Sequence, residues 1–319
     1  MRIGIVTPAP PGSYYGNRVT AVRWARILGK LDHRVSIHQT YDGQTLDLLI
    51  ALHARRSAAS VTRFRRKNPG APIVIALTGT DLYSDIRTSR QARESLEMAD
   101  RIIVLQPMAL KELRGTHKKK ARVIYQSVDE AGLKADGKRK LNRDFDVCVI
   151  GHLRPVKDPF RAALASRLLP SASGVRVLQV GRAMSRAMTQ RARSEMKINC
   201  RYRWLGELPP ARTSRILANS RICIVSSRIE GGANILSEAI VASVPVLASR
   251  VAGNVGILGD DYPGLFRFGD TQQLAQLITR AETNPEFPAE LRARLKKLAA
   301  LFGPLREQKA WARLLKEIK

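Results

Sequence analysis

The sequence has few of the features that mark secreted, membrane-spanning or metal-binding proteins. Its 319 residues include three cysteines, Cys148, Cys200 and Cys223, which are too few and too widely spaced for a disulfide framework or a zinc site. No apolar run reaches the roughly 18 residues of a membrane-spanning helix, and the N-terminus enters a strand pattern in place of a signal peptide. We therefore expect a cytoplasmic protein without integral membrane association.

Aromatic and acidic side chains are also scarce. Aromatics make up 5% of the chain, and no ribonucleoprotein, zinc-finger or helix-turn-helix signature accompanies them. Asp and Glu number 27 against 55 Lys and Arg, which gives a net charge of +28. Such a charge attracts nucleotides, phosphates and nucleic acid alike. The basic residues are scattered along the chain, which favours a solvated, arginine-rich surface over specific nucleic-acid binding.

Short apolar runs alternate with helical patterns, and 44% hydrophobic residues are enough to form real cores. In the first half, strands are predicted at residues 2–7, 35–38, 46–52, 72–77, 101–105 and 122–124, with helices at 19–31, 55–67, 87–98 and 108–113. A charged linker follows at 129–144. The alternation then resumes with strands at 145–150, 175–180, 221–225, 245–248 and 265–267, and helices at 159–168, 184–196, 274–282, 289–301 and 305–318, with further short segments at 202–205 and 212–219.

Repeated strand–helix order indicates parallel sheets covered by helices on both faces. We predict an α/β fold of two Rossmann-like domains whose sheets face each other across a cleft. The domains span residues 1–135 and 145–303, and a C-terminal helix at 304–319 packs back toward the first. Ligands of such folds bind beyond the C-terminal ends of the strands, so the loops there are the candidate site.

Two such loops lie in the first half. Ser13, Gly16, Asn17 and Arg18 stand in a glycine-containing turn that leads into a helix, which suits a phosphate or sugar approaching backbone amides. The turn lacks the P-loop and GxGxxG patterns, and alone it is equally an ordinary turn. Thr78, Gly79, Thr80 and Asp81 follow the strand at 72–77 and can hydrogen-bond a hydroxylated or anionic ligand. The alternative for Asp81 is a cap on the following turn.

Two more loops lie in the second half. Arg154 and Lys157 follow the strand at 145–150 and offer a forked and a point donor to a diphosphate. Their charges would stabilise a departing phosphate. After the strand at 221–225 comes a glycine turn and a helix N-terminus, flanked by two carboxylates eight residues apart; its candidate residues are Glu230, Gly231, Gly232, Ala233, Asn234, Ile235 and Glu238. The alternative is a solvated turn. Residues 249–256 form another strand-end loop.

No metal site is evident. The histidines show no HxxxH or Cys/His spacing, and His38, His53 and His152 are interpreted as structural. Asp144 and Asp146 resemble a DxD metal motif but precede their strand, so they are assigned to the linker. Cys148 and Cys223 lie in apolar strand patterns and are predicted to be core residues. We expect no cofactor.

Taken together, these loops resemble those of GT-B glycosyltransferases of the broad group-4 type, over nearly the whole chain. The resemblance implies that Arg154 and Lys157 bind the donor pyrophosphate, that Glu230 contacts the donor sugar and that Glu238 contacts the ribose. It also places Gly16 and the backbone of residues 231–235 near the donor, and counts Arg154, Lys157 and Glu230 as catalytic. The loop where many members have a donor-contacting His carries Thr-Gly-Thr-Asp instead.

Three phrases look more specific: PAPPGSYYGNR at 8–18, LTGTDLY at 77–83 and EGGANILSEA at 230–239. They resemble the selenosugar synthases of selenoneine biosynthesis, usually called SenB. That resemblance implies transfer of a glycosyl group from UDP-N-acetylglucosamine or UDP-glucose to selenophosphate, with release of UDP and phosphate. On this interpretation Ser13, Asn17, Arg18 and residues 78–81 form the acceptor side.

Two alternatives stay open at this stage. A conventional glycosyltransferase would use the same nucleotide-sugar donor and a hydroxyl acceptor, and its basic helices would suit an anionic membrane surface. A non-catalytic nucleotide- or nucleic-acid-binding protein would show salt-dependent binding without turnover. The sequence leaves the sugar, the stereochemical outcome and the oligomeric state open.

Overall fold

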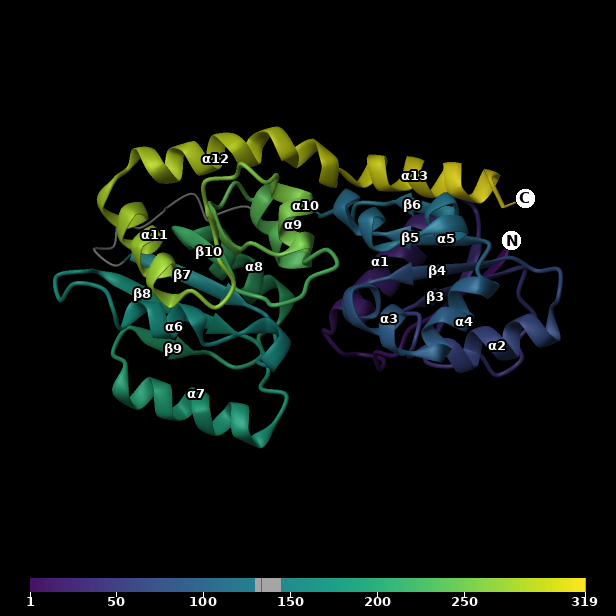
Figure 1. Cartoon of the computed structure of the whole chain (residues 1–319), viewed down its shortest axis with the longest axis horizontal. Helices are drawn as coiled ribbons and strands as arrows, with labels where there is room; N and C mark the ends of the chain where they lie inside the picture. Colours follow the sequence, from purple (N-terminus) through teal and green to yellow (C-terminus); the bar gives the residue numbers. More distant parts are fainter. Residues whose placement is uncertain (130–132, 134–144, 319) are drawn as a thin grey trace. The chain divides into compact units, whose positions relative to one another are not determined.

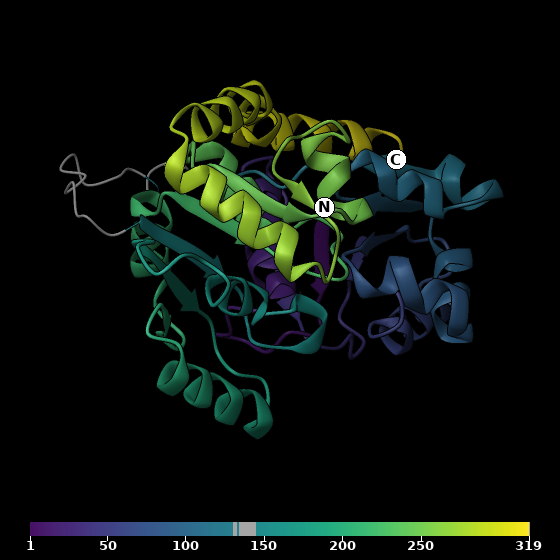
Figure 2. The same ribbon diagram turned by 60° about the vertical axis from the view of Figure 1, so that its left-hand side comes forward.

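A computed structural model describes residues 1–129, 133 and 145–318, and the chain divides into two compact units (Figures 1 and 2). Unit 1 comprises Met1–Ser127, Glu230–Gly232 and Gly303–Lys319, and unit 2 comprises Val128–Ile229 and Ala233–Phe302. Apart from residues 129 and 133, the predicted linker lies outside the described residues. No helix in the described part of the chain has both the length and the apolarity to cross a membrane.

Unit 1 is built on a six-stranded parallel sheet in the order β2-β1-β3-β4-β5-β6. Its strands are β1 (Arg2–Val6), β2 (Arg34–His38), β3 (Leu48–Leu52), β4 (Ile73–Leu77), β5 (Arg101–Val104) and β6 (Ala121–Val123). The sequences LLIAL of β3 and IVIAL of β4 are buried along their whole length. A parallel sheet covered on both faces requires such continuous apolar strands, because both sets of alternating side chains are buried.

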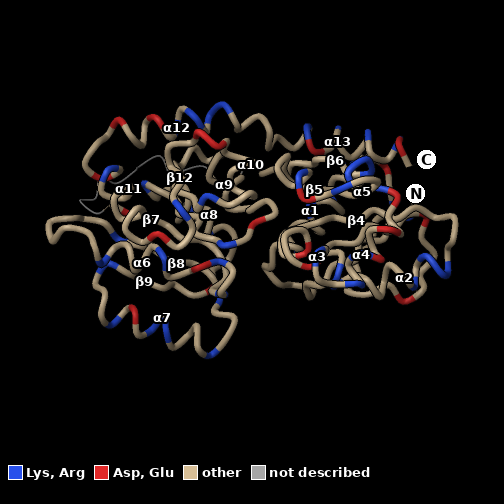
Figure 3. Tube along the Cα trace, in the orientation of Figure 1, with Lys and Arg blue, Asp and Glu red and all other residues tan. Residues whose placement is uncertain are grey.

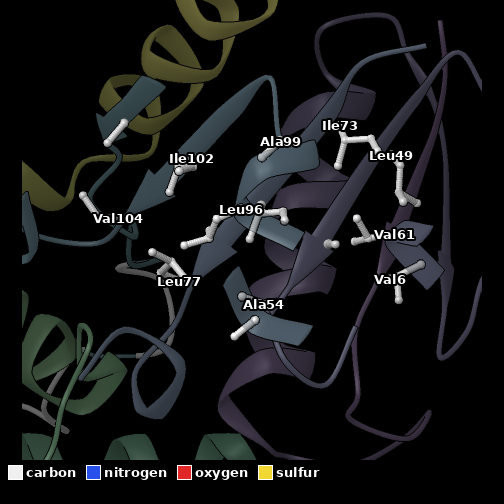
Figure 4. Close-up of a cluster of buried hydrophobic side chains, with 14 of the residues drawn as sticks. Val6, Leu49, Ala54, Val61, Ile73, Leu77, Leu96, Ala99, Ile102 and Val104 are labelled. Carbon is white, nitrogen blue, oxygen red and sulfur yellow. The ribbon is translucent and has the colours of Figure 1, made fainter. Parts of the chain in front are cut away.

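Two apolar cores lie on the two faces of this sheet. The covering helices are α1 (Gly16–Gly29), α2 (Ala58–Lys67), α4 (Arg90–Met98) and α13 (Pro304–Lys316). Leu49 of β3 packs with Val61 of α2 and Leu96 of α4 in one core (Figure 4). Ile50, the next residue of β3, belongs to the other core, with Trp24 of α1. The strand period of two thus assigns neighbouring residues to opposite faces.

Helix α13 lies in unit 1, although residues 128–302, most of which belong to unit 2, stand between Ser127 and this last segment of the chain. The rings of Trp24 and Trp311 meet edge to face, with centroids 4.9 Å apart. Both indoles are fully buried. Such a pair stabilises the protein by about 0.5–1.5 kcal/mol beyond its burial, so α13 is an integral part of this core.

Unit 2 has a second six-stranded parallel sheet, in the order β12-β11-β10-β7-β8-β9. Its strands are β7 (Phe145–Ile150), β8 (Val175–Val180), β9 (Tyr202–Trp204), β10 (Ile222–Val225), β11 (Val246–Ser249) and β12 (Leu265–Phe266). Its helices are α6 (Arg161–Ser166), α7 (Arg186–Ile198), α8 (Pro210–Asn219), α9 (Asn234–Val241), α10 (Ala252–Leu258), α11 (Thr271–Thr283) and α12 (Glu286–Leu298). Cys148 and Cys223 are register partners on β7 and β10, and both are free and fully buried.

The α/β class and the two parallel sheets are confirmed, while some short elements differ from the prediction. The predicted helix at 108–113 is a 3-10 helix, η2 (Pro107–Glu112), and α5 (Gly115–Lys120) was not expected. Helix α10 replaces most of the loop predicted at 249–256. Gly253 and Gly256 give this segment poor intrinsic helix propensity, so tertiary contacts must decide its conformation.

Candidate active site

The strands of a parallel sheet all end at the same edge, and this edge carries the predicted residues in each unit. In unit 1, acceptor-side candidates follow β1 and β4. In unit 2, donor-side candidates follow β7 and β10.

The loop after β1 ends in a helix N-terminus. Helix α1 begins at Gly16, so Gly16, Asn17 and Arg18 form its first turn, three residues earlier than the helix predicted from residue 19. The N-cap residue Tyr15 makes no capping bond with its side chain. Ser13 donates its hydroxyl to the carbonyl of Pro10 at 2.8 Å, which closes the turn. A 14-residue helix whose N-terminus has no side-chain cap offers partial positive charge to an anion.

Asp81 holds the loop that follows β4. Its side chain is fully buried, and its carboxylate accepts hydrogen bonds from the backbone N–H groups of Thr78 (3.0 Å), Gly79 (2.8 Å) and Ala54 (3.1 Å). All three donors precede Asp81 in the chain, so the carboxylate holds the loop that leads to it, which differs from the predicted alternative of a cap on the following turn. We assign Asp81 to positioning the loop, and its acceptor contact stays a prediction. Thr78 and Thr80 remain partly exposed on the same loop.

His53 lies at the end of β3, beside this loop. Its ring is buried, and Nε2 lies 3.1 Å from Thr80 Oγ1. The backbone N–H of Arg56 donates to Nδ1 at 3.4 Å. His53 has φ of +75°, in the left-handed region that side chains other than glycine seldom adopt. Strained backbone of this kind clusters at functional sites, so His53 is a candidate that spacing patterns alone do not reveal.

Charged groups surround His53. Asp81 Oδ2 lies 4.0 Å from Nδ1 and Asp85 Oδ2 lies 3.8 Å from Nε2, while Arg55 Nε donates to Asp85 Oδ2 at 2.9 Å. Burial lowers the pKa of His53, because it penalises the charged imidazolium; the Asp81 charge opposes this and Arg56 adds to it. The ring is thus surrounded by opposing charges and is kept neutral mainly by burial.

The short segment Glu230–Gly232 groups with unit 1 and lies against the β4 loop. A Cβ on Gly231 would stand 2.5 Å from the carbonyl oxygen of Thr78 and 2.8 Å from the backbone nitrogen of Gly79. Only glycine permits so close an approach between two backbones. Glu230 itself is 6% exposed. The structure therefore brings predicted residues from two distant parts of the sequence together within one unit.

In unit 2, Arg154 and Lys157 follow β7 through a firmly held turn. Arg154 is exposed in extended backbone, and η4 (Pro155–Lys157) forms one 3-10 turn that ends at Asp158 in the left-handed region. The hydroxyl of Ser226, just after β10, donates to the carbonyl oxygens of Lys157 (3.2 Å) and Asp158 (2.9 Å). These bonds tie the loops after β7 and β10 together and fix the backbone that carries the two cations.

A neighbouring loop supports the same turn. Gly181, just after β8, lies so close to Gly151 that a Cβ would stand 2.1 Å from its carbonyl oxygen, and its φ is +144°. Leu153 and Ala183 continue the contact as an isolated parallel bridge. Both the close contact and the positive φ require glycine at residue 181. The contact also orders the start of the loop that carries Arg154 and Lys157.

Helix α9 places the remaining donor-side candidates. It begins at Asn234, so Asn234 and Ile235 form its first turn, with Ala233 as an N-cap that makes no side-chain bond. Glu238 is the fifth residue of the helix and is partly exposed. Glu230 precedes the helix and groups with unit 1, whereas Glu238 lies in unit 2.

Buried polar bonds fix the ends of β10 and β11. The fully buried Asn254 donates through Nδ2 to the carbonyl oxygen of Ser249 at 2.9 Å, and Ser249 Oγ donates to the carbonyl oxygen of Ser227 at 2.5 Å. Asn254 thus anchors the N-terminal part of α10 to the strand before it, which explains why a glycine-containing segment is helical here.

The described residues contain no cluster of three or more His, Cys, Asp or Glu side chains placed to hold a metal ion. Of the DxD-like pair, residue 144 lies outside the described residues, and Asp146 is paired with Arg176 at 2.7 Å. Lys and Arg are distributed over both units (Figure 3).

Residues 134–301 match the family "Glycosyl transferases group 1", and this match spans more than half of the chain. The chain belongs to this family. It is also 27% identical over 226 residues to "Glycosyltransferase 1 domain-containing protein 1" of Xenopus tropicalis, an alignment that covers 65% of this chain and 65% of that relative.

Solved structures share the fold. The Anabaena protein HepE in complex with UDP and glucose superposes with a TM-score of 0.81 at 16% identity, over 99% of both chains. Sucrose-phosphate synthase from Thermosynechococcus elongatus superposes with a TM-score of 0.80 at 16% identity, over 99% of this chain and 98% of that one. These similarities confirm the predicted GT-B fold.

Proposed function

We propose that this glycosyltransferase is a selenosugar synthase that transfers a glycosyl group from a UDP-sugar, UDP-N-acetylglucosamine or UDP-glucose, to selenophosphate. A selenium lone pair attacks the anomeric carbon, the bond from that carbon to the phosphate oxygen breaks, and UDP leaves with the electron pair. Water then cleaves the selenium–phosphorus bond and releases phosphate. The chain needs no metal or cofactor in this scheme.

The observation that carries this proposal is the way the loops after β3 and β4 use their titratable side chains. Asp81 accepts three backbone hydrogen bonds, and His53 is buried with Nε2 at Thr80. Neither group is placed as a solvent-facing general base. A hydroxyl acceptor must give up a proton during transfer, so it depends more on such a base than selenophosphate, which is already ionised and strongly nucleophilic. The sequence phrases at 8–18, 77–83 and 230–239 support the same acceptor.

The proposed donor side is carried mainly by unit 2. Arg154 and Lys157 would bind the pyrophosphate and stabilise UDP as it leaves, since their loop is held rigid by Ser226. Glu238 would contact the ribose, and the backbone of Ala233, Asn234 and Ile235 at the start of α9 would approach the phosphates and sugar. Glu230, Gly231 and Gly232 would contact the donor sugar. HepE, the Anabaena neighbour, is described with UDP and glucose, which supports a UDP-sugar donor.

The proposed acceptor side belongs to unit 1. Asn17 and Arg18 in the first turn of α1 supply an amide and a guanidinium, while Gly16, the first residue of this helix, would approach the donor. Thr78, Gly79 and Thr80 supply hydroxyl and amide groups on the loop that Asp81 holds. Ser13 closes the turn before α1. Together these groups suit a small anion.

The buried, free cysteines on β7 and β10 fit a reducing cytoplasm.

A conventional transfer to a hydroxyl acceptor is the second candidate. It is favoured by the name of one structural neighbour, a sucrose-phosphate synthase. The two candidates share the donor half and differ in the nucleophile, so the acceptor decides between them.

The test is an anaerobic incubation of the purified protein with UDP-glucose or UDP-N-acetylglucosamine and selenophosphate, analysed by mass spectrometry. We expect a selenium-bearing sugar in step with UDP release. UDP release without selenium in the product would point to a hydroxyl acceptor or to hydrolysis. Failure to release UDP from either donor would contradict the donor assignment.

A further inference from the structure

The hydrogen bonds of His53 define which ring nitrogen carries its proton. The backbone N–H of Arg56 can only donate, so Nδ1, 3.4 Å away, must accept. A neutral imidazole then carries its hydrogen on Nε2. Asp81 Oδ2, at 4.0 Å from Nδ1, is too far for a hydrogen bond and accepts from the N–H of Ala54 instead.

The hydrogen on Nε2 of His53 determines which hydrogen bonds the Thr80 hydroxyl can make. An Nε2–H group at 3.1 Å donates to Thr80 Oγ1, which occupies an acceptor lone pair of this hydroxyl. The hydroxyl hydrogen of Thr80 is then available for a different partner. Thr80 is partly exposed, in a loop that Asp81 fixes through the N–H groups of Thr78 and Gly79. A hydroxyl in this state is a donor suited to an oxyanion.

We infer that His53 is a positioning residue that makes the Thr80 hydroxyl a hydrogen-bond donor for the phosphoryl oxygens of the anionic acceptor. The inference rests on the proposed function, which places selenophosphate at this loop. His53 has φ of +75°, and this strained backbone accompanies the placement of its ring beside Thr80 at the end of β3. The role is distinct from general-base catalysis, because the buried ring acts through Thr80 and does not reach the acceptor itself.

Asp85 and Arg55 complete the arrangement. Asp85 Oδ2 lies 3.8 Å from Nε2 and Asp81 Oδ2 lies 4.0 Å from Nδ1, so the two carboxylates balance each other and the N–H of Arg56 decides which nitrogen carries the hydrogen. Arg55 Nε donates to Asp85 Oδ2 at 2.9 Å and balances its charge. Asp81, Asp85, Arg55 and Arg56 are the charged groups that act on the ring, and they come from the segments after β3 and β4.

The first experiment observes the ring directly. Two-dimensional 1H–15N NMR of the histidine side chains at pH 7 should show His53 as a neutral ring with its hydrogen on Nε2. His53→Asn assigns the signals, because asparagine tolerates left-handed backbone better than most residues. Thr80→Val should shift the Nε2 signals by removing their acceptor. A hydrogen on Nδ1, or a charged ring, would overturn the inference whatever the acceptor of the reaction is.

The second experiment is a kinetic double-mutant cycle with UDP-sugar and selenophosphate. His53→Asn and Thr80→Val should each lower kcat/KM for selenophosphate by about 10- to 100-fold, as expected for a lost hydrogen bond to a charged group, and leave the KM for the UDP-sugar within about twofold. Thr80→Ser, which keeps the hydroxyl, should stay near the wild type. The double variant should be no slower than Thr80→Val, because His53 acts through Thr80.

The outcomes separate the two proposals. A wild-type protein that makes no selenium-bearing product contradicts the proposed function and with it the acceptor contact assigned to Thr80, and the ring NMR then decides only which nitrogen of His53 carries the hydrogen. If the wild type is active but the losses in kcat/KM of His53→Asn and Thr80→Val add up in the double variant, the inference is contradicted and the proposed function stands. The same holds if both variants raise the KM for the UDP-sugar as much as they lower kcat/KM for selenophosphate. His117→Asn, on the surface helix α5, is the matched control and should change neither measurement.

Discussion

The indole N–H of Trp24 donates to Glu307 Oε1 at 2.7 Å, between residues 283 positions apart in the chain. The other oxygen of Glu307 accepts the backbone N–H of Ser127 at 2.7 Å. One buried carboxylate on α13 therefore binds α1 through Trp24 and the segment after β6 through Ser127. Glu307 is 2% exposed, so its two partners have little access to water as a substitute.

Glu307→Ala should reduce the free energy of unfolding by about 2–4 kcal/mol, because two buried N–H groups lose their acceptor. Glu307→Gln, which keeps one acceptor oxygen, should lose less. Urea unfolding followed by tryptophan fluorescence measures both. Glu286→Ala, at an exposed position of α12, is the control. An unchanged unfolding midpoint for Glu307→Ala would contradict the role assigned to this carboxylate.

Gly181→Ala should weaken both stability and donor binding. The added Cβ would stand 2.1 Å from the carbonyl oxygen of Gly151, and the φ of +144° is itself unfavourable for alanine. We expect a loss of at least about 2 kcal/mol in unfolding free energy and a raised KM for the UDP-sugar, since the loop that carries Arg154 must move. Gly70→Ala, where a Cβ meets nothing within 4 Å, should have little effect.

Arg154→Ala should lower kcat by about 10²–10³-fold if the guanidinium stabilises UDP as it leaves. Arg154→Lys keeps the charge but not the forked geometry, and should recover only part of the rate. Initial rates of UDP release at saturating donor give the comparison. Arg186→Ala, exposed on α7, is the control for a change in net charge. Unaltered kcat and KM would remove Arg154 from the site.

Glu238→Ala should act mainly on donor affinity. Loss of a charged hydrogen bond to a ribose hydroxyl raises the KM for the UDP-sugar by roughly 10- to 150-fold, which corresponds to about 1.5–3 kcal/mol, with a smaller change in kcat. Glu207→Ala, an exposed acidic residue of the same unit, is the matched control. Equal affinity for UDP in titration calorimetry would show that Glu238 makes no ribose contact.

His53 should make stability depend on pH. Its pKa is lowered by burial from the ordinary 6.5, so in the window between its folded pKa and 6.5 the unfolded chain binds the proton more tightly. Stability therefore falls as the pH is lowered through this window, by at most about 1.4 kcal/mol per pH unit. Urea midpoints at pH 7.5 and 5.5 measure the slope. His53→Asn should reduce it, and an equal slope in both proteins would contradict a buried neutral ring.

Much of the fold follows from the sequence because its signals are local. The buried runs of β3 and β4 have no polar interruption, and alternation of such runs with helical patterns allows few topologies. Helix α10 was not predicted, because its two glycines oppose helix formation. Asn254 donates to Ser249, and Ser249 is in turn held by the carbonyl oxygen of Ser227 in the loop after β10, a contact with no local signal in the sequence. Tertiary context decides such segments.

The candidate site, like the fold, could be predicted where the signal is local and not where distant segments meet. Arg154, Lys157 and residues 230–238 could be selected because they follow predicted strands. The hydrogen bond from the N–H of Ala54 to Asp81, and the contact of His53 with Thr80, depend on loops from two different strands meeting in space. His53 carries no spacing signal. Its position directly after a buried strand, next to the similarly placed Thr78–Asp81 segment, was the one clue in the sequence.

The membership of α13 in unit 1 has a consequence for how the protein is made. Glu307 leaves the ribosome 180 residues after Ser127, its hydrogen-bond partner. At about 5–20 residues per second, this interval lasts roughly 10–35 seconds. During that time the indole of Trp24 lacks its acceptor, and the core that Trp311 completes stays open while the second unit emerges. Residues 1–127 alone are thus an incomplete folding unit, and this core closes only after the last helix of the chain has been made.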